Sequence, residues 1–161
     1  MSMHGHLRML TPSQIALVKR EPSGVRTLLS VLDRRQVDVH KAWHGLHFLL
    51  TGEAGHADGP LAFIAVGGEA VGDDLGSGPA RVIDPDATRA IADALDALGL
   101  DEIGARFDPD RMTELEIYPG GWRDKAPRWR GSLMQHLEEV RTLVREARDE
   151  GAGVLIWLSD R

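Results

Sequence analysis

The spacing of apolar residues along the chain predicts a series of amphipathic helices. Apolar side chains recur every three or four positions, which places them on one helical face, in residues 12–18, 25–32, 38–50, 85–98, 109–115 and 133–147. Three of these segments open on a polar residue followed by proline, namely Thr11-Pro12, Asp84-Pro85 and Asp108-Pro109. A side-chain oxygen at the N-cap and a proline in the first turn are typical of helix starts. We therefore expect five to six helices.

Short apolar runs predict the strands. The runs from Leu61 to Val66 and from Val154 to Leu158 are bounded by glycine, proline or polar residues, which indicates strands buried on both faces. Residues 80–83 predict a further strand. Together these elements predict an α+β fold, in which a small mixed sheet of three to four strands is covered by five to six helices.

Length and composition indicate one globular unit. A chain of 161 residues, 42% hydrophobic and 27% charged, can bury a substantial core and lies outside the composition range of disordered chains. No stretch resembles an interdomain linker, so we expect a single domain over residues 1–161. The net charge of −6 repels phosphate backbones and anionic membrane surfaces, so neither a nucleic acid nor a membrane is an expected partner.

The chain contains no cysteine, which excludes disulfides, thiol nucleophiles and thiolate metal sites. The N-terminal residues lack the apolar stretch of a secretory signal, and the longest apolar runs fall far short of the roughly 20 residues that span a bilayer. We therefore expect a soluble, cytoplasmic protein. No pattern in the sequence indicates a cofactor.

Three segments resemble the YfbM-like family of uncharacterised bacterial proteins. They are Trp43-His44-Gly45-Leu46-His47-Phe48-Leu49-Leu50-Thr51-Gly52, Gly78-Pro79-Ala80-Arg81 and Glu114-Leu115-Glu116-Ile117-Tyr118-Pro119. The resemblance extends along nearly the whole chain and implies a single α+β domain of about this length. It implies no particular activity, because the members of the family are proteins of unknown function.

Three histidines form the only metal-ligand pattern in the sequence. His40, His44 and His47 are spaced four and three residues apart, so on one helix they would share a face and could reach one zinc-sized ion. No carboxylate lies where a zinc-protease motif would need it. The alternative is one histidine satisfied at the edge of the core and two on the surface, and we favour this alternative, without a metal.

His47, Glu116 and Tyr118 are the candidates for acid–base chemistry. All three belong to segments that carry the resemblance, and a histidine beside a carboxylate is the minimal arrangement for moving a proton. The alternative is a structural polar cluster that satisfies backbone groups. The sequence contains no Gly-x-Ser-x-Gly nucleophile elbow.

Trp43, Arg81 and Trp122 are the candidates for ligand binding, because indole rings stack on flat groups and a guanidinium binds anions. The loop after Pro119 also interleaves Trp122 and Trp129 with four basic residues. Solvated charges and two tryptophans that anchor the loop explain this pattern equally well. The leading hypothesis is a binding or protein-interaction module for a small molecule or a protein. The alternative is a small hydrolase or transferase that uses the His/Glu/Tyr group.

Overall fold

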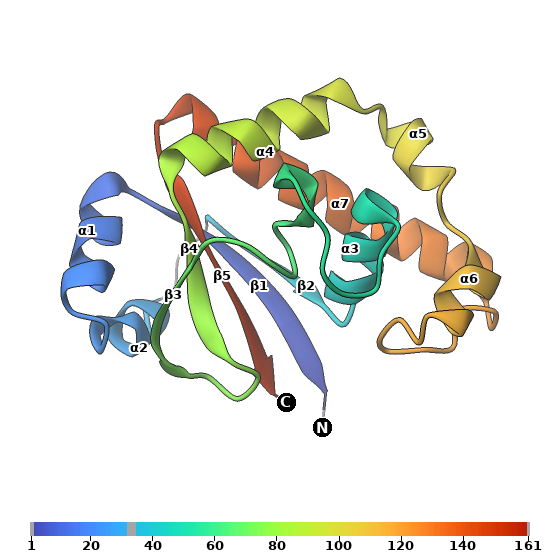
Figure 1. The fold of residues 1–161 in the computed structure, drawn as a ribbon, viewed down its shortest axis with the longest axis horizontal. Coiled ribbons are helices and arrows are strands. Elements are labelled where there is room, and N and C mark those ends of the chain that lie inside the picture. The colour runs from blue at the N-terminus through green and yellow to red at the C-terminus, as the bar shows by residue number, and fades with distance from the viewer. Residues whose placement is uncertain (1, 32–34, 161) are drawn as a thin grey trace.

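The structure, a computed structural model, describes residues 2–31 and 35–160. Within these residues five strands form one sheet in the order β2-β1-β5-β4-β3, and every neighbouring pair is antiparallel. The strands are β1 (Met3–Leu10), β2 (Gln36–His40), β3 (Glu69–Asp74), β4 (Pro79–Ile83) and β5 (Gly153–Asp160). Figure 1 shows β1 and β5 side by side in the middle of the sheet, with the two chain ends close together.

Seven α-helices and one 3₁₀ turn accompany the sheet in the described part of the chain. They are α1 (Pro12–Arg20), α2 (Gly24–Leu29), α3 (Trp43–Thr51), η1 (Pro60–Ala62), α4 (Pro85–Ala97), α5 (Leu100–Gly104), α6 (Pro109–Glu114) and α7 (Ala126–Asp149). The predicted α+β class is confirmed. The predicted numbers of strands and helices were too low, and the sheet is antiparallel throughout instead of mixed. None of the described helices combines the length and apolar character needed to cross a membrane.

The capped helix starts were predicted correctly. Thr11 and Gln14 form a capping box, in which the Thr11 hydroxyl accepts the Gln14 N–H at 3.2 Å and the Gln14 side chain accepts the Thr11 N–H at 2.9 Å. The carboxylates of Asp84 and Asp108 each accept the N–H three residues further on. These contacts are local, and a short sequence motif is therefore enough to reveal them.

The prediction of one helix over residues 38–50 was wrong in its first part. Strand β2 occupies this stretch up to His40, and α3 begins only at Trp43. Val37 and Val39 alternate with polar neighbours, which is the period of a strand. Residue 32, the end of another predicted helix, lies outside the described residues.

The prediction of a strand over residues 61–66 was also wrong. Ala62, Phe63 and Ile64 are buried, but η1 and the turn after it carry them, and the Ala65 and Val66 N–H groups both bond to the Ala62 carbonyl. A short apolar run indicates burial without distinguishing a strand from a buried turn. The predicted strands over residues 80–83 and 154–158 are confirmed as β4 and β5.

Strand β1 was missed because it carries polar residues on one face. Leu7 and Met9 enter the larger core, whereas His6 and Arg8 are buried on the opposite face. Buried polar side chains require hydrogen-bond partners, and those of His6 and Arg8 come from distant parts of the chain. Without knowledge of these partners, the sequence of this segment does not predict a central strand.

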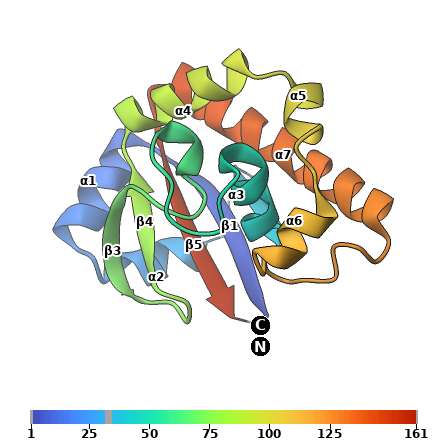
Figure 2. The same ribbon diagram turned by 45° about the vertical axis from the view of Figure 1, so that its right-hand side comes forward.

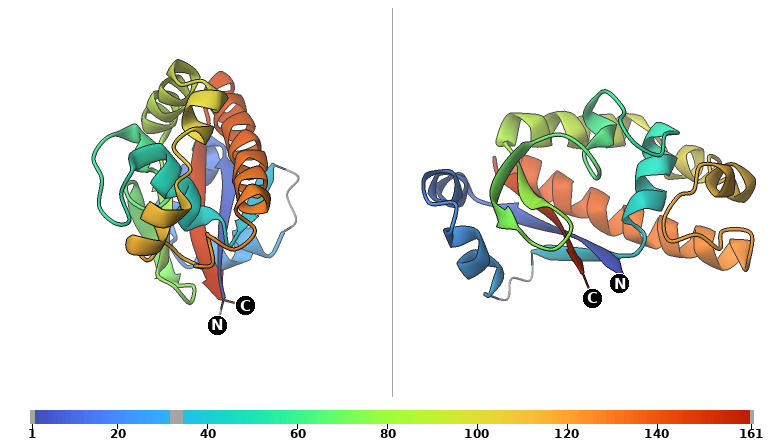
Figure 3. Two further views of the ribbon diagram at one scale, coloured as in Figure 1. Left: turned by 90° about the vertical axis from the view of Figure 1, so that its right-hand side faces the viewer. Right: turned by 60° about the horizontal axis from the view of Figure 1, so that its bottom comes forward.

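The two faces of the sheet are covered unequally. One face packs against α3, η1, α4 and α7 in the larger core, where α4 and α7 run side by side (Figures 1 and 2). The other face packs against α1 and α2 near β3 in a smaller core that includes Leu10, Val82, Leu155 and Trp157. Figure 3 shows that these two helices leave the ends of β1 and β5 near the chain termini without helical cover.

The same substitution at two glycines is expected to have opposite effects on stability. A Cβ atom on Gly153 would lie 2.4 Å from the Ile83 carbonyl oxygen and 2.7 Å from Ile15, whereas one on Gly131 in α7 would meet nothing within 4 Å. Gly153→Ala is therefore expected to lower the free energy of unfolding by about 1–3 kcal/mol through overpacking. Gly131→Ala is expected to raise it by up to about 1 kcal/mol through helix propensity. Urea denaturation measures both, and an unchanged midpoint in Gly153→Ala would contradict this close packing.

Candidate functional site

Helix α3 carries one fully buried histidine, His47, and one half-buried histidine, His44. The helix ends as predicted at Thr51-Gly52, where Gly52 adopts a left-handed conformation with φ of 76° and its N–H bonds to the Phe48 carbonyl at 2.7 Å. All residues from Gly45 to Leu50 are buried. The side chains of this helix therefore mainly pack in the core and contact the neighbouring loops, and binding a ligand can only be a secondary role.

His44 fastens two loops to α3. Its Nδ1 accepts the Tyr118 backbone N–H at 2.8 Å, and its Nε2 donates to the Ala54 carbonyl at 2.6 Å. A carbonyl can only accept and a backbone N–H can only donate, so these partners fix the neutral tautomer with the proton on Nε2. Both ring nitrogens are then occupied, and neither is available to a metal ion.

His47 is fully buried and has one occupied ring nitrogen. Its Nε2 donates to the Gly55 carbonyl at 2.7 Å, while its Nδ1 has no hydrogen-bond partner among the described residues. Burial lowers the pKa of His47 below its ordinary value of 6.5, and the bond to Gly55 offsets only part of that shift. The imidazole is therefore held neutral.

The structure does not bring His47, Glu116 and Tyr118 together. The Tyr118 hydroxyl accepts the Met3 backbone N–H at 2.9 Å, and the Tyr118 ring stacks on Trp43 with ring centres 5.9 Å apart. Glu116 is exposed, with a φ of 54°. Within the described residues no hydrogen bond or ion pair joins any two of the three predicted acid–base groups.

The three predicted metal-ligand histidines are also separated. His40 lies at the end of β2 and not on α3, and its ring contacts those of His4 and His136 at centre distances of 5.7 and 5.9 Å. The His44 and His47 rings lie 6.5 Å apart. Over residues 2–31 and 35–160, no three side chains of the metal-ligating types His, Asp and Glu are placed to hold an ion.

Two of the three predicted ligand-binding residues line one cavity. Trp43 and Arg81 face a space of about 250 Å³ between α3, β4, β5 and the segment after η1. Its other lining residues are mainly apolar, and they include Ile64, Ala65, Pro79, Ile156 and Leu158. Trp122 lies elsewhere. It is fully buried, and its indole N–H donates to the Ile117 carbonyl at 2.8 Å.

Arg81 carries a half-buried positive charge, and none of the described residues is an acidic partner for it. Its guanidinium donates to the carbonyls of Phe63, Ile64 and Gly67 at 3.1, 2.6 and 2.7 Å. Within the described residues no carboxylate lies at ion-pair distance from it. Burial lowers the pKa of Arg81 to about 10, which still leaves the side chain charged at neutral pH.

The segments that carry the family resemblance meet around Trp43. Tyr118 stacks on one side of the indole, and Arg81 shares its cavity. The Trp43 N–H donates to the Met3 carbonyl at 3.3 Å, which ties the ring to the start of β1. Neither the spacing nor the composition of these segments revealed that they converge.

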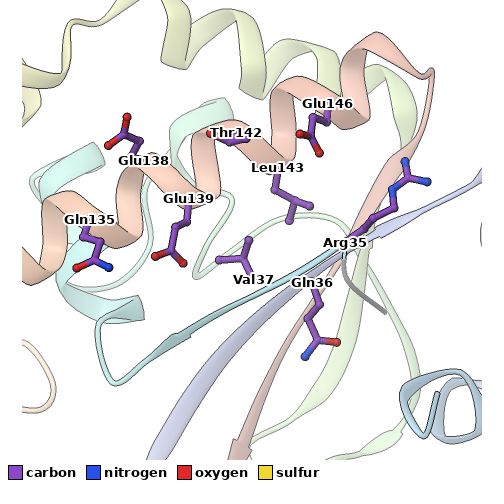
Figure 4. A pocket seen from close by; sticks show the side chains of 9 residues that line it. All are labelled: Arg35, Gln36, Val37, Gln135, Glu138, Glu139, Thr142, Leu143 and Glu146. Carbon is purple, nitrogen blue, oxygen red and sulfur yellow. The ribbon is translucent and has the colours of Figure 1, made fainter. Parts of the chain in front are cut away.

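A larger groove of about 510 Å³ runs between β2 and α7 (Figure 4). Glu138, Glu139 and Glu146 line it from α7, and the Leu143 and Val37 side chains point toward one another across it. None of the residues predicted as a site from the sequence lines this groove. In the basic and tryptophan-rich loop the rings of Trp122 and Trp129 contact each other at a centre distance of 4.6 Å, Trp122 is buried, and Arg123 bonds to Asp110 at 2.7 Å.

Sequence reasoning missed a hydrogen-bonded row on the opposite face of the sheet. His6 bonds through Nδ1 to Asp38 Oδ1 at 2.6 Å and through Nε2 to Ser159 Oγ at 2.7 Å. These residues lie 32 and 153 positions from His6 in the chain. The one local signal was the alternation of His4, His6 and Arg8 with less polar neighbours, which predicts a strand and not a site.

Acidification is expected to destabilise the protein through His47. Below pH 6.5 the unfolded chain binds a proton at this residue that the folded chain excludes, so the free energy of unfolding falls with falling pH. His136, whose pKa is lowered by burial, acts in the same direction. His47→Gln should therefore reduce, without abolishing, the loss of stability between pH 7.5 and 5.5 in urea denaturation. The exposed His56→Gln is the control, and an equal loss in all three proteins would contradict the prediction.

Comparison with known proteins agrees with the family resemblance. The model of a family described as a domain of unknown function (DUF1877) matches residues 1–157. Protein YfbM of Escherichia coli (strain K12) is 32% identical over 89 residues, which are 53% of this chain and 53% of that protein, so the match spans about half of the relative.

A solved structure has the same fold. The crystal structure of YfbM from Escherichia coli, titled as a protein of unknown function, matches 95% of this chain and 98% of that chain. The TM-score is 0.77 at 24% identity, a likeness that concerns the fold alone. Since the family model covers nearly all of the sequence, the chain belongs to the DUF1877 family, a family of unknown function that includes YfbM-like proteins.

Proposed function

We propose that this chain is a binding module that holds a small organic anion, a carboxylate or a phosphate, in the cavity between Trp43 and Arg81. The observation that carries the proposal is the half-buried guanidinium of Arg81 without a carboxylate partner among the described residues. A charge removed from water is costly unless it is compensated. Three carbonyl dipoles compensate part of this charge, and an anion would compensate the rest.

The hydrogen-bonding capacity of Arg81 supports the same conclusion. A guanidinium has five N–H donors, and the three bonds to Phe63, Ile64 and Gly67 use one N–H of Nη1 and both of Nη2. The Nε–H and the second Nη1–H bond to none of the described residues and could bind a ligand. Hydrogen bonds from a charged donor to an anion are about twice as strong as those between neutral groups.

The cavity walls indicate what the rest of the ligand resembles. Trp43 offers an aromatic face, and Pro79, Ile156 and Leu158 offer apolar surface. The volume of about 250 Å³ is slightly below the roughly 300–1,000 Å³ of common ligand pockets. A small anion that bears one flat or apolar group matches both the charge and the size of the cavity.

Small aromatic anions are expected to stabilise the folded protein. Benzoate and phenyl phosphate serve as probes, while benzyl alcohol and benzylamine supply the neutral and cationic comparisons. A ligand present at a hundred times its Kd stabilises the folded state by about 2.7 kcal/mol, which corresponds to roughly 5–10 °C in Tm for a chain of this size. Thermal unfolding measures the shift, and equal shifts with benzyl alcohol would contradict a role for the charge.

Two variants test whether the shift arises in the cavity. Arg81→Met keeps the length of the side chain and removes its charge, so the shift caused by benzoate should disappear. Ala65→Leu fills part of the cavity while leaving every hydrogen bond of Arg81 in place, and it should weaken the shift in a folded protein. Arg89→Met, which removes an exposed arginine beside Asp86, is the matched control. Undiminished binding to both cavity variants would overturn the proposal.

A further inference from the structure

The residues Asp38, His6 and Ser159 form a continuous row across three strands of the sheet. Asp38 lies on β2, His6 on β1 and Ser159 on β5, and the two hydrogen bonds that join them measure 2.6 and 2.7 Å. The row lies on the sheet face opposite the larger core, and none of its three residues lines the cavity of Trp43 and Arg81. Nothing in the proposed binding function uses it.

The strand register creates this row. His6 pairs directly with Asp38 on one side and with Trp157 on the other. Ser159 lies two residues beyond Trp157 and therefore projects from the same face. The buried imidazole of His6 stacks on the Trp157 indole with ring centres 5.0 Å apart and planes inclined by 19°. Packing thus holds the imidazole in one orientation.

The hydrogen-bond partners also fix the position of the proton on His6. Burial raises the pKa of Asp38, but the hydrogen bonds from His6 and Gln36 more than offset this, so the pKa lies below its ordinary value. Asp38 is then a carboxylate at neutral pH and can only accept. In the neutral imidazole the proton must therefore reside on Nδ1, which leaves the Nε2 lone pair to accept the Ser159 hydroxyl proton.

Gln36 and Arg8 hold the Asp38 carboxylate in place through further hydrogen bonds. The Gln36 amide donates to Asp38 Oδ1 at 2.9 Å, and the Gln36 oxygen accepts two N–H groups of Arg8 at 3.0 and 2.7 Å. Arg8 in turn donates to the carbonyls of Leu28 and Val31 at 2.6 and 2.9 Å. The carboxylate is thus oriented by a chain of bonds that runs to α2 and the residues after it.

We propose that Ser159 is a nucleophile for acyl transfer from small carboxylic esters, with His6 as its general base and acid and Asp38 as the residue that positions the imidazole. A serine, a histidine and a carboxylate joined in this order by hydrogen bonds constitute the arrangement that activates a hydroxyl. Asp38 retains 42% of its side-chain surface, and Ser159 is half-buried. The row is therefore accessible to solvent at its two ends, Asp38 and Ser159.

The reaction takes place in two balanced steps. Ser159 Oγ forms a bond to the ester carbonyl carbon while its proton moves to His6 Nε2. The bond from that carbon to the alkoxy oxygen then breaks, and the departing alcohol takes the proton from Nε2. Water attacks the acyl-serine in the same way, which releases the carboxylic acid and restores the Ser159 hydroxyl. The overall change is ester plus water to acid plus alcohol.

A fluorophosphonate probe on the full chain tests the nucleophile directly, because an activated serine displaces fluoride and keeps the phosphonyl group. Intact-mass and peptide analysis should show one adduct, located on Ser159 and absent in Ser159→Ala. His6→Gln should slow labelling by at least about a hundredfold, the range of general-base effects. Ser77→Ala is the matched control, since the Ser77 hydroxyl bonds to the Asp160 carboxylate at 2.7 Å without an intervening imidazole. Labelling of this variant should equal that of the unchanged protein.

Asp38 requires a test that separates positioning from structure. Asp38→Asn offers the imidazole an amide N–H, which favours the tautomer with the proton on Nε2 and blocks proton acceptance from Ser159. Labelling of a folded Asp38→Asn protein should therefore fall at least tenfold, and Asp38→Glu should restore part of it. Cleavage of p-nitrophenyl acetate should fall in parallel and should be at least tenfold slower in Ser159→Ala.

The proposal fails if the unchanged protein gives no adduct on Ser159, or if labelling continues undiminished in folded Asp38→Asn. Adducts confined to other residues also overturn it. Circular dichroism and cooperative urea unfolding establish that each variant is folded. Ser159→Ala removes only a half-buried hydroxyl, so this variant still decides the question if His6→Gln does not fold.

Discussion

The antiparallel pairing of β1 with β5 is the constraint on which both candidate sites depend. The two strands pair along eight residues each, from the Met3–Asp160 pair to the Leu10–Gly153 pair. Side chains alternate between the two faces of a strand, so this register decides which residues enter each core. A shift of the β1 register by one residue would turn the side chain of His6, and the other polar side chains on its face of the strand, toward the larger core. The same strand pairing thus places residues of the cavity on one face of the sheet and the polar row on the other.

Arg8, which is buried, and Arg81, which is half-buried, both bond through their guanidinium groups to other parts of the chain, but to different extents. Arg8 satisfies four of its five donors on Gln36, Leu28 and Val31, whereas Arg81 satisfies three on backbone carbonyls. Each of them ties an irregular segment to the sheet. Arg8 is almost completely enclosed and acts as a structural cross-link. Arg81 lines the cavity, and two of its N–H donors bond to none of the described residues. For this reason Arg81, and not Arg8, is proposed to bind the ligand.

Local signals were predictable from the sequence, and long-range ones were not. The capping box at Thr11 depends on residues three positions apart, and β5 is apolar on both faces, so each could be recognised from its own segment. Strand β1 is different, because its buried polar residues are tolerated only with partners from β2, β5 and α2. The candidate sites could not be predicted for the same reason, because they too depend on contacts between residues distant in sequence. Helical spacing grouped His40 with His47, although β2 ends before α3 begins, and no pattern links His6 to Ser159 across 153 positions.

The pairing of β1 with β5 also determines when the sheet can be completed during synthesis. Strand β1 is made long before its longest partner, β5, because all the other described helices and strands lie between them in the sequence. Contacts between residues so distant in sequence close slowly, because a long loop must be ordered first. Until β5 emerges from the ribosome, the larger core lacks Val154 and Ile156, and the edge of β1 that pairs with β5 has no partner. The middle of the sheet is therefore completed only after all the other described elements have been made.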